Sequence, residues 1–232
     1  MSRRPFAVFS LALLTLAAAG CRNQSDGGEE LSYIRTPGSG YAPTVATENL
    51  LPLRAGAHWS LQVRNEKAAL PDEEQRVVGA NATGGTIETL QAGKVTQTET
   101  YRVTSKGIEI LATGVSLSQT LSPPLLLIPL PPEEEKVSVW QGSAGSGAQT
   151  FVGQAWSRVT RRETVTTPAG TFAAWRVDTR TELTLGDRRE MVQITRWLTT
   201  GIGIVRQKIV TPGQMIVKDL KKLPAIETTG VT

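Results

Sequence analysis

The sequence predicts an all-β, mainly antiparallel fold, a curved sheet or incomplete barrel preceded by an N-terminal signal helix. Three observations predict it. Apolar and polar residues alternate in many short segments, Thr and Val are abundant in these segments, and Gly and Pro punctuate the gaps between them. Beyond the first 21 residues, no segment shows a convincing helical repeat.

The first 20 residues have the layout of a secretory signal peptide. Arg3 and Arg4 precede an apolar run over 6–19, and small residues follow immediately before Cys21. The run is too short for a membrane-spanning helix. Cys21 is the only cysteine of the chain, so the mature protein can form no internal disulfide and depends on a hydrophobic core for its stability.

Residues 21–49 are predicted to form a flexible tether, because they are rich in Gly, Ser and charged residues. The alternative is that this segment docks on the domain through Tyr33, Ile34 and Tyr41. Either way, few of its residues could join a core.

The body of the chain is predicted to be one antiparallel β domain over 50–223, followed by a loose C-terminal tail over 224–232. Two β-rich halves, 50–120 and 125–220, are an alternative organisation. Each half would open with a proline-containing apolar segment that leads into a strand carrying Trp.

Alternating segments predict the individual strands before residue 170. They are 59–64, 86–90, 96–103, 107–111, 137–140 and 156–165. The clearest unit follows over 172–220, where Gly186-Asp187 and Pro212-Gly213 provide two tight turns. These turns predict a four-stranded antiparallel meander.

The first turn sets the register of its hairpin, from Leu185 opposite Arg188 out to Trp175 opposite Leu198. One face then collects apolar side chains and the other polar ones, together with Met191 and Trp197. A slip of one residue would exchange the two faces, so this separation supports the register. The apolar face holds Trp175, Val177, Leu183, Leu185, Val192, Ile194 and Leu198.

The second turn predicts that Arg206 lies opposite Asp219, a mildly favourable pairing of opposite charges across a ladder. By contrast, the prolines in the apolar segment 121–132 argue against a helix or a central strand. We expect that segment to be extended across an apolar surface.

Three short motifs resemble a broad group of bacterial exported proteins of unknown function. They are Pro52-Leu-x-x-Gly56-x-x-Trp59, Pro168-Ala-Gly-Thr-Phe172 and Trp197-x-x-x-Gly-Ile-Gly-Ile-Val205. The resemblance covers most of 50–210. It implies a fold similar to the lipoprotein-carrier (Lol) superfamily, which is a curved antiparallel sheet forming an incomplete barrel.

The segment Leu16-Ala-Ala-Ala-Gly-Cys21 resembles the bacterial lipobox. The resemblance implies cleavage before Cys21 and attachment of lipid to that cysteine, so the protein would be exported and anchored in the cell envelope. Arg22 stands where an Asp would favour retention at the inner membrane. By the same resemblance, this implies the outer membrane, if the organism has one.

The inventory of catalytic residues is small. His58 is the only histidine, which excludes a multi-histidine metal site, and its position beside Trp59 fits a surface or turn residue. Because the sequence has no P-loop, dinucleotide fingerprint or nucleophile elbow, we predict no cofactor, no metal and no enzymatic activity.

After cleavage, 23 basic and 21 acidic residues remain, which gives a net charge of +2. Without a basic block, nucleic-acid binding has no support.

Two acidic runs, 72–74 and 133–135, keep a carboxylate-dependent hydrolase as a minor alternative. Both runs are expected to lie in polar loops next to prolines, where carboxylates are solvated.

The combined features predict a membrane-anchored envelope lipoprotein with a non-enzymatic, β-rich binding or structural domain. Its partners would be the membrane, through Cys21, and a protein, a glycan or an apolar ligand. The alternative is a carrier of an apolar or lipid ligand in the concave face of the sheet. The candidate ligand or lid surface comprises Trp197, Arg176, Leu125, Leu126 and Leu127.

Overall fold

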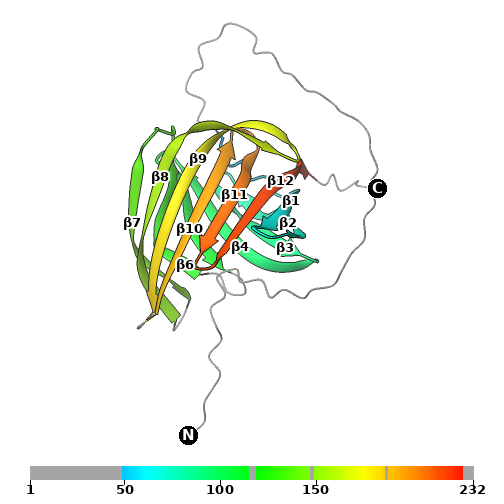
Figure 1. Cartoon of the computed structure of the whole chain (residues 1–232). Helices are drawn as coiled ribbons and strands as arrows, with labels where there is room; N and C mark the ends of the chain where they lie inside the picture. Colours follow the sequence, from blue (N-terminus) through cyan, green and yellow to red (C-terminus); the bar gives the residue numbers. More distant parts are fainter. Residues whose placement is uncertain (1–48, 115–118, 147–148, 186–187, 227–232) are drawn as a thin grey trace, which may run out of the picture. The chain divides into compact units, whose positions relative to one another are not determined.

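The structure is a computed structural model that describes residues 49–114, 119–146, 149–185 and 188–226. These residues form twelve β-strands (Figure 1). The strands are β1 (Ala57–Asn65), β2 (Ala69–Asn81), β3 (Gly84–Gln91), β4 (Lys94–Thr104), β5 (Gly107–Gly114), β6 (Gln119–Pro129), β7 (Val137–Ser146), β8 (Gln149–Thr167), β9 (Gly170–Leu185), β10 (Arg188–Thr199), β11 (Gly203–Thr211) and β12 (Gln214–Ile226).

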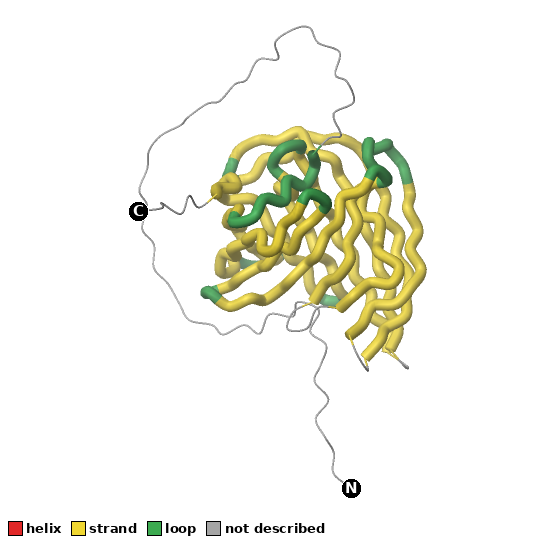
Figure 2. Tube along the Cα trace, turned by 180° about the vertical axis from the view of Figure 1, so that it is seen from behind, coloured by secondary structure: helices red, strands yellow, loops and turns green. Residues whose placement is uncertain are grey.

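The strands form a closed antiparallel barrel. Each strand pairs with the next one in sequence, and β1 pairs with β12 to complete the ring. Short loops join neighbouring strands at the ends of the wall, and the described residues contain no helix (Figure 2). The predicted all-β antiparallel fold is therefore confirmed, and the barrel is closed where the sequence had indicated an incomplete one.

The predicted register of the β9–β10 hairpin is confirmed. Leu185 lies opposite Arg188 and Trp175 opposite Leu198, although the turn at 186–187 itself lies outside the described residues. The next hairpin also forms as predicted, with Arg206 opposite Asp219. Its turn contains Gly213 at φ 82°, a left-handed conformation that glycine adopts without steric cost.

The main hydrophobic core fills the barrel. Val177 of β9 and Leu198 of β10 are completely buried there, together with Ile108, Leu127 and Ile128 from the facing strands. Alternation along the strands produces this core, since every second side chain points inward. The predicted apolar face of the hairpin is thus the inner face of the barrel wall.

A second, smaller cluster is built where the long β8–β9 hairpin bends (Figure 1). Val165 and Ala174 of this hairpin pack there with Trp197, Val205 and Leu220. The backbone amide of Ala169 donates a 3.0 Å hydrogen bond to the Leu220 carbonyl, which ties the hairpin to β12.

The prediction that the proline-rich segment 121–132 could not be part of a central strand is wrong. Most of it belongs to β6, which pairs with β5 on one side and with β7 on the other. Pairing with β7 covers only 120–122, and Pro123 and Pro124 follow immediately. Because proline has no amide hydrogen to donate, the ladder on this side ends where the prolines begin.

The two ends of the domain are joined to the barrel. Leu50 and Leu51 are buried in the core, and the Gly201 amide donates a 2.8 Å hydrogen bond to the Asn49 carbonyl. At the other end, β12 continues through Pro224 to Ile226, where it pairs with β1. Cys21, the tether and residues 227–232 lie outside the described residues.

The acidic run 72–74 does not form the predicted loop, because it lies within β2. Alternation along this strand turns Glu73 inward, where it is 2% exposed, whereas Glu74 remains exposed. The other acidic run, 133–135, does lie between strands, and its Glu133 and Glu135 form exposed ion pairs with Lys136 and Arg158.

Candidate functional site

A charged cluster crosses the interior of the barrel. Arg196 of β10 donates a 2.8 Å hydrogen bond from Nη2 to Oε1 of Glu99 on β4, and the Tyr101 hydroxyl donates to Oε2 of the same carboxylate at 2.9 Å. The Arg196 side chain is 2% exposed. The Glu99 carboxylate therefore accepts one hydrogen bond from the opposite wall, from Arg196, and one from its own strand, from Tyr101.

The surroundings shift the pKa values of this cluster. Burial, followed by the Glu99 charge, raises the pKa of Tyr101 well above 10.0. Burial acts to lower the pKa of Arg196, but the electrostatic and hydrogen-bond interactions with Glu99 and Tyr101 together outweigh it and raise that pKa. The cluster thus holds a neutral phenol beside a charged guanidinium.

Two further polar contacts lie inside the wall. Lys218 Nζ donates to Glu73 Oε2 at 2.6 Å, and both side chains are at most 5% exposed. Trp59 Nε1 donates to Gln75 Oε1 at 2.8 Å. Together with the Arg196–Glu99 pair, the interior holds two cations matched by two carboxylates.

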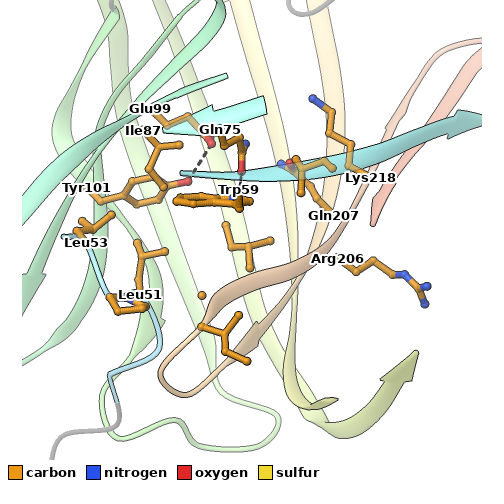
Figure 3. Close-up of a pocket in the computed structure, with 15 residues that line it drawn as sticks. Leu51, Leu53, Trp59, Gln75, Ile87, Glu99, Tyr101, Arg206, Gln207 and Lys218 are labelled. Carbon is orange, nitrogen blue, oxygen red and sulfur yellow. Dashed lines mark hydrogen bonds between the residues drawn. The ribbon is translucent and has the colours of Figure 1, made fainter. Parts of the chain in front are cut away.

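A small cavity of about 20 Å³ lies next to these groups (Figure 3). Tyr101, Glu99, Trp59 and Gln75 converge on it, whereas the side chain of Arg206 points away. A volume of this size holds about one water molecule. The cavity is therefore far too small for the lipid that a carrier would hold in its concave face.

One of the polar side chains that line the cavity has an unused donor. Gln207 is 6% exposed, and its Nε2 has no partner among the described residues. Its strand neighbours are Arg196 on β10 and Lys218 on β12. A water molecule in the cavity would be within reach of this amide, which fits the polar lining.

Two of the sequence motifs meet at the mouth of this cavity. Leu53 and Trp59 come from the first motif, and Ile202, Gly203 and Ile204 come from the third. Gly203 has a φ of 103°, a conformation that other residues rarely adopt. The motifs thus have an architectural role, which is to close one part of the barrel interior.

Trp197 is 9% exposed and belongs to the second apolar cluster. Its Nε1 donates a 2.6 Å hydrogen bond to Glu163 Oε1, and the guanidinium carbons of Arg176 and Arg206 lie 5.8 Å and 5.9 Å from its ring centroid. Trp197 and Arg176 are neighbours, as the sequence indicated. Arg176, itself on β9, lies over the Trp197 ring in a cation–π contact and is 35% exposed, whereas the Trp197 ring is buried against the β8–β9 hairpin.

The other predicted site residues lie elsewhere. Leu125 and Leu127 are buried in the main core, and Leu126 is half-buried on β6. The structure does not bring these leucines together with Trp197, which belongs to the second cluster. Cys21, the predicted lipid attachment site, lies outside the described residues.

The outer face of the wall has its own hollow, of about 460 Å³. It spans β7 to β10 and is lined by Gln141, Gly142, Val152, Gly153, Gln154, Glu182, Thr184 and Arg189. Glu182 is almost buried at its floor and pairs with Arg180 at 2.6 Å and with Arg189. Hydrogen bonds from Arg189 first, and then from Arg180, lower the pKa of Glu182.

Within the described part of the chain, no group of three His, Cys, Asp or Glu residues is placed to hold a metal ion. No helix of that part is long and apolar enough to cross a membrane. Sequence reasoning missed the buried charges Glu73, Glu99, Arg196 and Lys218 and the outer hollow.

Comparison with known proteins gives a family match and two similar structures. Residues 133–209 match the family model described as DUF3108-like. A crystal structure of a "putative lipoprotein" from Parabacteroides distasonis is 12% identical, with a TM-score of 0.39, over 75% of this chain and 97% of that chain. A "putative exported protein with YmcC-like fold" from Bacteroides fragilis is 12% identical, with a TM-score of 0.40, over 74% and 97%. No curated protein matches the chain.

Proposed function

We propose that this chain is an exported lipoprotein of the cell envelope, anchored through Cys21, whose β-barrel is a non-enzymatic binding domain that engages its partner on the outer face. The signal-like residues 1–20 and the single cysteine directly after them support the anchor. Several buried methylenes on acyl chains, each contributing about 0.8 kcal/mol, would hold the protein at a membrane.

The observation that carries the binding role is the contrast between the two hollows. The interior cavity of about 20 Å³ is bordered by Glu99, which is already bonded to Arg196 and Tyr101. The outer hollow is about 460 Å³, which is within the usual range for small-molecule sites. A small-molecule ligand therefore fits the volume of the outer hollow and not that of the interior cavity.

The same contrast weighs against a catalytic role. Hydrolysis by two carboxylates needs two acidic groups facing one pocket. Glu99 is the only carboxylate in the lining of the interior cavity, and Glu182 is the only one in the lining of the outer hollow. Glu99 and Glu182 are each held by arginines, and neither has a second carboxylate in the same lining. We therefore assign a binding role to the outer hollow and not a hydrolytic one.

The test is lipid extraction and mass analysis of the protein purified from its own membrane. We expect the N-terminal fragment to begin at Cys21 and to carry the mass of attached acyl chains. A Cys21→Ser variant should keep its signal peptide and yield no acylated fragment. An unmodified cysteine in the mature wild-type protein would overturn the anchor.

A further inference from the structure

Glu182 at the floor of the outer hollow is shared by Arg189, which lines the hollow, and by Arg180, which lies next to the lining, so one positive charge is in excess there. The single carboxylate of Glu182 accepts hydrogen bonds from Nη2 of Arg180, from Nη2 of Arg189 and, at 3.5 Å, from Nε2 of Gln154. The Glu182 side chain is 7% exposed, whereas those of Arg180 and Arg189 are 51% and 68% exposed. Since a guanidinium has five N–H donors, both arginines have donors left for a ligand that lies above Glu182.

Three other arginines on the same outer face each pair with a single acid. Arg158 pairs with Glu135, Arg161 with Glu163 at 3.0 Å, and Arg176 with Asp178 at 3.0 Å. Asp219 also pairs with two arginines, Arg64 and Arg206, elsewhere on the surface, but in the outer hollow the shared acid is Glu182, with Arg189 in the lining and Arg180 beside it. A ligand with one compact negative charge fits this arrangement better than a long polyanion does.

The remaining lining suits hydroxyl groups. Gln141 and Gln154 lie opposite each other on β7 and β8, and Gln154 lies opposite Glu182 on β9. Gln154 directs one N–H to Glu182, and its second N–H and its Oε1, like the amide of Gln141, can bond a sugar hydroxyl. Next to them, Val152 is 60% exposed and offers an apolar surface to the carbon face of a ring.

We propose that this hollow is a binding site for a small acidic sugar, a ligand with one carboxylate or phosphate group on a hydroxylated ring. Arg180 and Arg189 would bind the acidic group in charge-assisted hydrogen bonds. Gln141 and Gln154 would bind the hydroxyls. The proposal rests on the proposed function, because it names the ligand class for binding at the outer face.

The test is a titration of the full-length protein, purified in detergent from its own membrane, with three hexoses that differ at C6. Glucose, glucuronic acid and glucose 6-phosphate are followed by saturation-transfer NMR. We expect either acidic sugar to bind at least about tenfold more tightly than glucose, and the tighter of the two identifies the acidic group. Equal binding of all three, or no binding, would overturn the proposal.

Titration with inorganic phosphate tests whether the negative charge alone accounts for binding of the acidic sugar. Inorganic phosphate should bind more weakly than glucose 6-phosphate, because it has no ring whose hydroxyls could reach Gln141 and Gln154 while the phosphate is bound by the arginines. If inorganic phosphate binds as tightly as the preferred sugar, the site is an anion site only and the sugar proposal is wrong.

Two matched variants locate the site. Arg189→Gln removes an exposed guanidinium from the hollow and should weaken binding of the acidic sugar about tenfold, while binding of glucose stays the same. Arg161→Gln removes a guanidinium that is 65% exposed on the same face but lies outside the lining, and it should leave binding unchanged. If the two variants weaken binding equally, a general surface charge acts and the site is overturned.

The result can be separated from that of the anchor test. Acylated Cys21 together with failed titrations would overturn the acidic-sugar site and leave the envelope lipoprotein in place. Specific binding by a chain that is not acylated would overturn the anchor alone.

Discussion

Arg196 and Glu99 form an ion pair across the barrel although 97 residues separate them in the chain. Their strands, β10 and β4, stand directly opposite each other in the ring, with five strands between them on either side. The pair therefore bridges facing walls, and Tyr101 adds a second donor to the same carboxylate. The bridge and the hydrophobic core around it occupy the interior, so the cavity beside them is too small for a lipid ligand.

Arg196→Met should destabilise the protein by about 3–5 kcal/mol, because it leaves the buried Glu99 carboxylate without its cation. Equilibrium unfolding in urea measures the loss. The double variant Glu99→Gln/Arg196→Met carries neither charge and still offers an acceptor to the Tyr101 hydroxyl. It should recover most of the loss. A cost below about 1 kcal/mol for the single variant would contradict the bridge.

Tyr101 should make the protein sensitive to high pH. Its pKa in the folded protein is raised above 10.0, its value in the unfolded chain, mainly by burial. The folded state therefore binds the phenolic proton more tightly. The resulting stability is fully present below pH 10.0 and is lost as the pH rises through the folded pKa.

The measurement for Tyr101 is the free energy of unfolding on both sides of pH 10.0, compared between the wild type and Tyr101→Phe. The variant loses the hydrogen bond to Glu99 at every pH. It should also decline less steeply in alkali, because it has no buried phenol to ionise. Parallel declines of the two proteins would show that Tyr101 does not contribute to the alkaline loss.

The strands and their local pairing could be predicted because both depend on short-range patterns. The turn signal of Gly186-Asp187 in the sequence and the alternation on either side of it sufficed to place Trp175 opposite Leu198. The same register puts Arg196 opposite Val177 on the apolar face, which is a signal for a buried, paired charge. Its partner could not be predicted, because Glu99 comes within reach only when the whole ring closes.

Other residues were misinterpreted because local composition outweighed alternation. Pro71 and the acids that follow it looked like a loop, yet Glu73 occupies an inward position of β2 beside Lys218. In β6, Pro123 and Pro124 did end pairing with β7, whereas pairing with β5 is interrupted over 121–124 and resumes at Leu125. The outer hollow depends on four neighbouring strands and has no signature in any single segment.

Trp197 should stabilise the contact between the β8–β9 hairpin and the barrel wall. Trp197→Ala removes a large buried ring from the second cluster and should cost about 3–5 kcal/mol. Trp197→Phe keeps most of the ring but loses the hydrogen bond to Glu163, so a cost of about 1 kcal/mol is expected. Urea unfolding of both variants provides the measurement. If the alanine variant is no less stable than the phenylalanine variant, the ring does not act as a packed core residue.

The end of pairing between β6 and β7 should be visible in amide hydrogen exchange. Residues 143–145 of β7 pair with β6 on one side and with β8 on the other, whereas 137–141 pair only with β8 within the described part of the chain. Alternate amides along 137–141 therefore face β6 without a backbone acceptor there, and they should exchange much faster than the amides of 143–145. Hydrogen exchange followed by NMR resolves each amide. The adjacent amides of 137–141, which point toward β8, serve as the control within the same strand. Uniform protection of all the amides from 137 to 145 would mean that the prolines of β6 do not end the ladder.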